Sequence, residues 1–283
     1  MIKTWSTEYK NEERILRPCD LCGGVYFKKH FFCEGWEYIK CTKCGLVQVN
    51  PQPIEPQVHQ RYDKSYLDYE LANEKAFLDL ALKSLDDAGI DDIKKIVTDD
   101  PALGASVLDI GCATGALLEH LRDASWEVKG IEISKPEAEY ACNTRGLDVS
   151  YLPLQEKKFP SESFSVVIAS HLIEHLNSPA AFVKEVLRIL KPGGFFIVIT
   201  PNIDSFQAKL FGAQWRSAIF DHLFLFSKRT LCALLKEFFI IEKISTWGGL
   251  AAGYAPRPIK NIFDKAAKHF DFGDVMLVRA HKI

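Results

Sequence analysis

Val107-Leu-Asp-Ile-Gly-Cys-Ala-Thr-Gly115 is the stretch of this 283-residue chain that decides its fold. An apolar run ends there in an acid, Asp109, and passes into a turn that contains two glycines, before a segment with helical character. Gly111 and Gly115 let the backbone turn tightly and approach a ligand closely, and the start of the following helix offers free N–H groups. The stretch therefore predicts a strand, a nucleotide-cofactor turn and a helix.

The spacing of this turn argues against a dinucleotide. A dinucleotide fingerprint has the form G-x-G-x-x-G, whereas here three residues separate Gly111 from Gly115, and an acid precedes the first glycine. A second apolar run, Val128 to Ile133, carries Glu132, which follows Gly111 by 21 residues. We expect this acid to accept hydrogen bonds from the hydroxyls of a ribose, and it disfavours a 2′-phosphate.

VLDIGCATG followed by GIEIS resembles the first two cofactor motifs of the class I S-adenosylmethionine-dependent methyltransferases. The resemblance covers roughly residues 100 to 283 and implies an α/β, Rossmann-like sheet of seven strands whose last strand is antiparallel. Further motifs follow in the family's order and spacing: Phe159 to Ala169, His171-Leu-Ile-Glu-His175, Leu190-Lys-Pro-Gly-Gly194 and Thr200-Pro-Asn202.

Alternating strands and helices beyond residue 100 are typical of a parallel sheet covered on both faces. We expect strands near 105–110, 127–132, 147–151, 164–169, 194–200, 239–246 and 274–281. Helices are expected between them, near 115–124, 135–145, 179–190 and 228–237. A further segment, residues 66–88, has helical periodicity and is expected to cover the cofactor site.

The resemblance also implies where the cofactor, S-adenosylmethionine, is held. Asp109 would orient its ammonium directly or through water, and Glu132 would hold the ribose hydroxyls. The remaining contacts would come from the glycine turn around the methionine portion, from packing on adenine, and from the backbone that wraps adenine: Gly111, Cys112, Gly115, Ile133, Leu154 and Gln155.

Three histidines are candidates for the catalytic base that removes a proton from the acceptor. His171 and His175 follow the fourth strand, whose carboxyl end faces the ligand crevice in open α/β sheets. His222 lies in a segment, Phe211 to Ser227, that resembles the active-site flap of methyltransferases acting on small molecules and sugars. A structural hydrogen-bonding role is the alternative for each histidine. The four-residue spacing of His171 and His175 also suits a metal, but the sequence shows no third ligand.

Four cysteines near the start of the chain have the spacing of a zinc ribbon. Cys19-x-x-Cys22 and Cys41-x-x-Cys44 are separated by 18 residues, and a glycine follows each pair. Such turns direct sulfur atoms and backbone N–H groups at one metal, so that coordination stabilises a segment too small for its own core. We predict structural Zn²⁺, with iron in a rubredoxin-like site as the alternative.

The chain is expected to divide into a zinc ribbon over residues 1–50, a linker and cofactor-covering helical region over 51–100, and a methyltransferase domain over 101–283. We expect the ribbon and the methyltransferase domain to have separate sources of stability. The net charge is only −2, no apolar stretch reaches membrane-spanning length, and the first residues are too polar for a secretory signal. These features predict a cytoplasmic protein without a membrane partner.

The acceptor is the least defined part of the prediction. The favoured hypothesis is a small molecule, such as a sugar, a nucleotide-linked sugar or another biosynthetic intermediate, with O-methylation slightly preferred over C- or N-methylation. An RNA base methyltransferase is the alternative, but residues 1–65 hold ten Lys and Arg against eight Asp and Glu, and RNA binding usually needs a stronger basic stripe. A non-catalytic protein with a methyltransferase shell is the third hypothesis.

Overall fold

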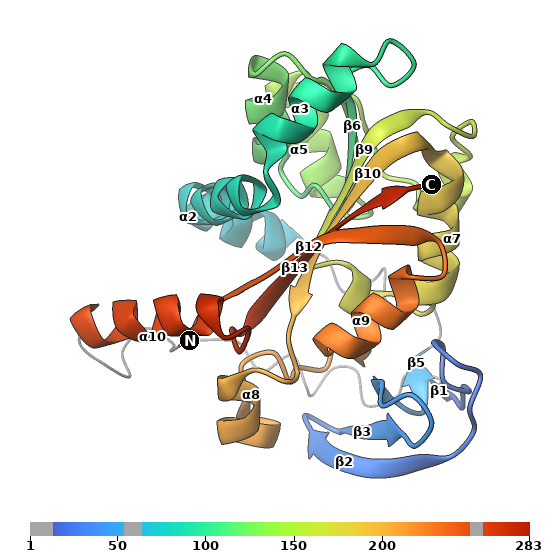
Figure 1. The fold of residues 1–283 in the computed structure, drawn as a ribbon, viewed down its shortest axis with the longest axis vertical. Helices are drawn as coiled ribbons and strands as arrows, with labels where there is room; N and C mark the ends of the chain where they lie inside the picture. The colour runs from blue at the N-terminus through green and yellow to red at the C-terminus, as the bar shows by residue number, and fades with distance from the viewer. Residues whose placement is uncertain (1–13, 54–63, 250–256) are drawn as a thin grey trace.

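A seven-stranded sheet forms the centre of the protein (Figure 1). The structure is a computed structural model that describes residues 14–53, 64–249 and 257–283. The strand order is β12-β13-β10-β9-β6-β7-β8, and β13 runs antiparallel to both of its neighbours. The pairs from β10 to β8 are parallel. This topology confirms the predicted Rossmann-like sheet with its last strand antiparallel.

The expected elements are present, with boundaries close to the predicted ones. The strands of this sheet are β6 (Ser106–Ile110), β7 (Glu127–Ile131), β8 (Val149–Ser150), β9 (Phe164–Ser170), β10 (Leu190–Pro201), β12 (Phe239–Trp247) and β13 (Val275–Lys282). The helices are α2 (Lys64–Ala88), α3 (Ile90–Asp99), α4 (Ala116–Asp123), α5 (Lys135–Arg145), α6 (Leu154–Lys157), α7 (Pro179–Ile189), α8 (Phe206–Phe211), α9 (Lys228–Leu235) and α10 (Arg257–His269), with short 3₁₀ turns η3 (Ile173–His175) and η4 (Gly212–Gln214).

Helices cover both faces of the sheet, which explains why its central strands are apolar on both sides. Figure 1 shows α3, α4 and α5 on one side and α7 and α9 on the other. Successive residues of β6 alternate between two cores, because Val107 packs with α3 and α4 while Leu108 packs with α7 and α9. The carboxyl ends of β6, β7 and β9 are thereby fixed side by side, and the functional side chains follow them.

Residues 27–49 contribute three strands to a second sheet that is completed by a distant part of the chain. Its strands are β2 (Phe27–Cys33), β3 (Trp36–Cys41) and β4 (Val47–Val49), and β4 pairs antiparallel with β11 (Phe224–Leu225). A short ladder of β1 (Arg14–Ile15) with β5 (Gln52–Pro53) lies beside it. The ribbon sheet, defined as β2, β3, β4 and β11, therefore takes its fourth strand from the part of the chain that forms the seven-stranded sheet.

Side-chain contacts also join the ribbon sheet to the rest of the protein. The hydroxyl of Tyr38 in β3 donates to the carbonyl oxygens of Ile219, at 2.6 Å, and His222, at 2.9 Å. Trp36 and Phe224 belong to one continuous core that extends to α7 and α9. These contacts do not support separate sources of stability for the two parts. The sequence hid this connection because β11 is only two residues long and lies in an irregular segment.

The ribbon also caps a helix that covers the seven-stranded sheet. The carboxylate of Asp20 accepts hydrogen bonds from Ser178 Oγ, at 2.8 Å, and from the backbone N–H of Ala180, at 2.7 Å, at the start of α7. Next to it, the side-chain amide of Asn177 donates to the carbonyl of Pro53 at 3.0 Å.

Among the helices of the described ranges, none is long and apolar enough to cross a membrane.

Candidate active site

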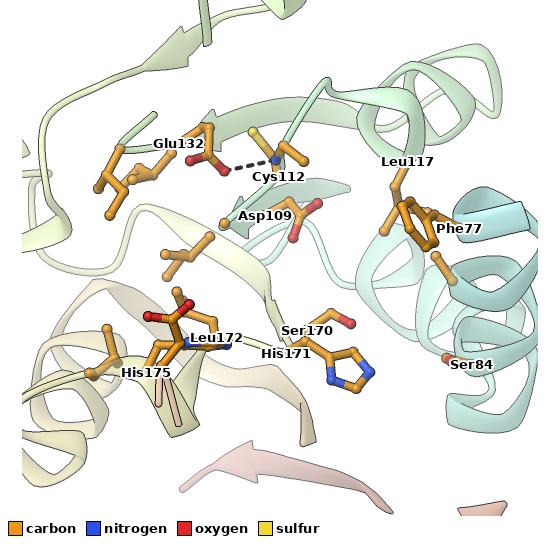
Figure 2. A pocket seen from close by; sticks show the side chains of 18 of the residues that line it. Phe77, Ser84, Asp109, Cys112, Leu117, Glu132, Ser170, His171, Leu172 and His175 are labelled. Atoms are coloured by element: carbon orange, nitrogen blue, oxygen red, sulfur yellow. Dashed lines mark hydrogen bonds between the residues drawn. The ribbon is translucent and has the colours of Figure 1, made fainter. Parts of the chain in front are cut away.

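A cavity of about 1640 Å³ opens at the carboxyl ends of β6, β7 and β9. Figure 2 shows Asp109 and Glu132 on one side of it and His171 and His175 on the other, with Phe77 of α2 at its edge. Pockets for one small ligand occupy roughly 300–1,000 Å³. The cavity therefore has room for a cofactor and a second molecule.

The glycine turn has the geometry that the sequence predicts. Gly111 and Gly115 both have φ of 79°, a left-handed conformation that side chains rarely adopt. A Cβ on Gly115 would lie 2.6 Å from Leu147 Cδ1, so this glycine also allows the start of α4 to pack closely on Leu147. Gly111 and Cys112 line the cavity, whereas Gly115 starts α4 outside it. Gly115 thus supports the turn without reaching the ligand space.

Glu132 ties the end of β7 to the glycine turn. Its two carboxylate oxygens accept hydrogen bonds from the backbone N–H groups of Ala113, at 2.9 Å, and Ser134, at 2.8 Å. Burial raises the pKa of Glu132 to about 7, although both N–H contacts oppose the shift. Each oxygen keeps a lone pair for a further donor, so the carboxylate could still hold two ligand hydroxyls.

Other acids gather at this end of the cavity. Burial, assisted by the charge of Glu132, raises the pKa of Asp109 to about 7. Burial also raises the pKa of Glu70, which lines the cavity from α2 together with Glu74. Glu74 accepts from Thr114 Oγ1 at 3.0 Å and pairs with an arginine of α5. The sequence predicted that α2 covers the site but not that its acids enter it, because charged residues on a helix usually face solvent.

The expected adenine-binding residues also line the cavity. Ile133 follows β7 and Glu132 directly, and Leu154 and Gln155 open α6. Leu154 is buried and joins the core beneath the cavity, while Ile133 is half-buried. These three residues thus form an apolar and backbone-lined wall next to the acid that would hold a ribose.

The three candidate histidines lie near one another but differ in access to the cavity. His171 and His175 line it, and the imidazole of His171 is about half exposed. His222 is buried behind His175, with the two rings edge to face and their centroids 4.6 Å apart. Nδ1 of His222 lies 2.8 Å from the carbonyl oxygen of Ser217, which can only accept, so Nδ1 carries the hydrogen.

Burial makes His222 a weak base. Desolvation and the neighbouring His175 lower the pKa of His222 to about 3. Burial alone would raise the pKa of Glu174, but its contact with His171 and the nearby His175 lower it to about 2. A proton acceptor works best with a pKa near the working pH. The placement therefore favours His171 and His175 over His222 for contact with an acceptor.

Four cysteine sulfurs converge at one end of the ribbon sheet. Their Sγ atoms lie within 4.8 Å of one another, with Cys19 and Cys44 at 3.4 Å and Cys22 and Cys41 at 3.6 Å. Tetrahedral Zn²⁺ with Zn–S bonds of about 2.3 Å separates sulfurs by about 3.8 Å, so the cluster fits such an ion.

The backbone around the four cysteines leaves room for this cluster and donates to it. N–H groups of the Cys22 turn donate to the sulfur of Cys19, and those of the Cys44 turn donate to Cys41. A Cβ on Gly24 would approach the sulfurs of Cys22 and Cys41 to 3.3 Å, which explains the glycine at this position. None of the eight cysteines forms a disulfide.

Arg17 is a cavity residue that the sequence did not single out. It precedes the first cysteine pair, and its backbone is held by Asn50, whose side chain bonds both the N–H, at 3.1 Å, and the carbonyl, at 3.0 Å. Its Nε is buried and has no hydrogen-bond partner within the described ranges. The ribbon thus brings a guanidinium with an unpartnered Nε, within the described ranges, to the cavity, and this placement depends on how the ribbon docks.

Comparison with known proteins identifies the family. The chain matches the model of a methyltransferase domain over residues 65–238, which is more than half of its length. The chain therefore belongs to the methyltransferase domain family. This assignment confirms the resemblance to the class I S-adenosylmethionine-dependent methyltransferases that the motifs predict.

Two relatives show how much of the chain is shared. A ubiquinone biosynthesis O-methyltransferase of Caulobacter vibrioides is 33% identical over 108 residues, which are 36% of this chain and 43% of the relative. A probable S-adenosylmethionine-dependent methyltransferase of Mycolicibacterium smegmatis is 35% identical over 105 residues, 37% of this chain and 41% of the relative. The chain thus spans less than half the length of these two curated relatives.

A solved structure supports the fold over a larger share. A SAM-dependent methyltransferase of Thermotoga maritima, described as a possible histamine N-methyltransferase, aligns with a TM-score of 0.55 and 20% identity. The alignment covers 80% of this chain and 99% of that chain. At this identity the likeness shows the fold alone.

Proposed function

We propose that the cavity binds S-adenosylmethionine and that the protein transfers its methyl group to a small molecule. The observation that carries the proposal is the arrangement around the glycine turn. Asp109 lies near the carboxyl end of β6, Glu132 directly follows the neighbouring parallel strand β7, and both face a cavity whose opposite wall bears His171 and His175. The cofactor supplies an activated methyl group, so the protein's own task is to align an acceptor and accept its proton.

The residues present fit this cofactor. Glu132 would hold the ribose hydroxyls with the lone pairs that its two N–H contacts leave free, and Asp109 would hold the ammonium. Gly111 keeps the backbone close to the methionine portion, while Ile133, Leu154 and Gln155 border adenine. The cavity acids favour a ligand with positive charge, and the buried position of Asp109 makes that preference strong.

We expect the affinity for S-adenosylmethionine to rise as the pH increases from about 6 to about 8, by up to about tenfold per pH unit for each proton released. Asp109 and Glu132 have pKa values of about 7 in the free protein, and a cationic ligand favours their charged forms. Binding therefore lowers these pKa values and releases protons below about pH 7. Calorimetry in buffers of different ionisation enthalpy measures both effects. A pH-independent affinity without proton release would contradict the assignment.

The acceptor we propose is a small molecule with a negative charge, such as a nucleotide-linked sugar, methylated on oxygen. Arg17 supports this choice, because its buried Nε has no hydrogen-bond partner in the described part of the chain and its side chain reaches the cavity. A guanidinium in such a place suits a phosphate or carboxylate. The names of the curated relatives, ubiquinone O-methyltransferases among them, favour a small acceptor and oxygen as the methylated atom.

Replacing Arg17 with alanine should weaken binding of nucleotide-linked sugars by roughly 10- to 100-fold, which corresponds to the loss of one charge-assisted contact. The measurement is calorimetry with a panel of nucleotide-linked sugars beside the same free sugars. Lys29→Ala is the matched control, because Lys29 is a basic residue of the ribbon whose side chain is 87% exposed and outside the cavity. If structured RNA binds and none of the nucleotide-linked or free sugars does, an RNA acceptor is favoured instead.

We also propose that Cys19, Cys22, Cys41 and Cys44 bind a structural Zn²⁺. The short sulfur separations, the N–H groups aimed at the sulfurs and the close glycine support four-thiolate coordination. Metal analysis of the purified protein distinguishes zinc from iron, since both ions accept this ligand set.

A further inference from the structure

Three metal-binding side chains meet directly behind the cavity wall. Glu174 and His175 belong to η3, and His222 lies just before β11, which packs against η3. One ligand atom from each residue lies within 4.8 Å of the others. Donors bound to one ion at about 2.1 Å are about 3 Å apart, so side-chain adjustments of about an ångström would close the site.

Two of these ligand groups are buried without the partners that such atoms need. Glu174 is fully buried, and its Oε2 accepts from Thr200 Oγ1 at 2.9 Å. Its Oε1 makes no hydrogen bond within the described residues and lies at an ion-pair distance of 3.4 Å from His171 Nδ1. Nδ1 of His175 is also buried without a hydrogen-bond partner in the described residues. Buried polar atoms are nearly always satisfied, by protein, ordered water or an ion. One ion would satisfy both atoms.

His222 is oriented in the way that metal-binding histidines are. Its Nδ1–H donates to the carbonyl of Ser217 at 2.8 Å, so Nε2 carries the free lone pair. A carbonyl in this role fixes the tautomer and the ring direction of a histidine ligand. The hydroxyl of Tyr38 holds the backbone carbonyl of His222 at 2.9 Å, so the ribbon sheet helps to position this residue.

We propose that Glu174, His175 and His222 bind a divalent first-row transition-metal ion, separate from the ion of the four cysteines. Two imidazoles and one carboxylate favour ions such as Zn²⁺, Mn²⁺ or Fe²⁺ and leave coordination positions open. The sequence had suggested His171 and His175 as a pair without a third ligand. The structure instead groups His175 with the adjacent acid and with a histidine from a distant segment.

The proposed ion also narrows the choice of acceptor. His175 lines the cavity, and Leu172 of the same segment borders Gly111 of the cofactor turn, so an ion held by His175 would lie near the space proposed for the methyl donor. Such ions bind oxygen donors and act as Lewis acids toward them. An acceptor with neighbouring oxygen atoms therefore fits best. This last step rests on the proposed methyl transfer, whereas ion binding itself does not.

The test uses Co²⁺ as a spectroscopic probe added to the metal-free full chain. We expect two equivalents to bind, one with the intense thiolate charge-transfer absorption of the cysteine site and one with weaker visible bands and no thiolate signature. His175→Asn and Glu174→Gln should each lower the affinity of the second equivalent at least tenfold. His120→Asn is the matched control, since His120 is exposed on α4, and it should keep both equivalents.

Two results would overturn the proposal. One is a native protein that binds a single equivalent with the thiolate signature, and the other is a second equivalent whose affinity is unchanged in both variants. His175 is the informative position if Glu174→Gln unfolds, because His175 is only half-buried at the cavity wall. Calorimetry with S-adenosylmethionine on the same samples separates the two proposals, since failure of cofactor binding would leave a second Co²⁺ site intact.

Discussion

Replacing Glu132 with glutamine should weaken S-adenosylmethionine binding by about 100-fold, the largest effect that we expect from a single cavity residue. Charge-assisted hydrogen bonds contribute about 1.5–3 kcal/mol each, and a factor of ten in affinity corresponds to about 1.4 kcal/mol. The glutamine keeps one acceptor oxygen, but it loses the charge and the second acceptor. The side chain can then no longer hold both ribose hydroxyls while it also accepts from Ala113 and Ser134.

The folded state should tolerate this change better than the ligand does. Burial disfavours the charged form of Glu132, so a neutral side chain of the same shape removes an unfavourable buried charge above about pH 7. We expect the unfolding midpoint of the ligand-free variant to stay within a few degrees of the native protein. Glu139→Gln is the control, because Glu139 is a largely exposed acid of α5 that pairs with Lys135 at 3.5 Å. An affinity within threefold of the native value would refute the role of Glu132.

The part of the fold that local pattern controls could be predicted from the sequence. The strand at 106–110 is a buried apolar run that ends in an acid and a glycine turn, and Glu132 repeats this pattern one strand further on. Parallel strands end at the same edge of a sheet, so the two acids had to meet there. Their place in the cavity follows from topology and needs no knowledge of long-range packing.

The acceptor side could not be predicted in the same way. Glu174 and His222 come from distant segments, and they meet because β11 joins the ribbon sheet and packs on η3. Arg17 reaches the cavity from the ribbon. No periodicity marks a strand as short as Phe224–Leu225. The sequence made His222 a candidate base in a segment that resembles an active-site flap, but the hydroxyl of Tyr38 and the carbonyl of Ser217 hold it inside the protein.

Replacing Cys41 with serine should lower the unfolding midpoint of the whole protein by more than about 10 °C, in one transition. Structural zinc sites contribute roughly 10–16 kcal/mol of apparent binding free energy, which is comparable to the total stability of a domain. Cys41 is buried in the core that the ribbon sheet shares with α7 and α9. Loss of the metal would therefore loosen β3 and β4, and with them β11 and the backbone around His222.

Differential scanning calorimetry with metal analysis measures this effect, and Cys33→Ser is the matched control. Cys33 lies in the same sheet outside the four-sulfur cluster, and its thiol donates to the carbonyl of Ala218 at 2.9 Å, a bond that serine can also make. We expect this control to retain its metal and unfold near the native temperature. Two separate transitions in Cys41→Ser, the second at the native midpoint, would mean that the methyltransferase part folds independently of the ribbon. A single transition at a lowered temperature would mean that the metal also stabilises β11 and the backbone around His222, because the pairing of β4 with β11 joins them to the ribbon sheet.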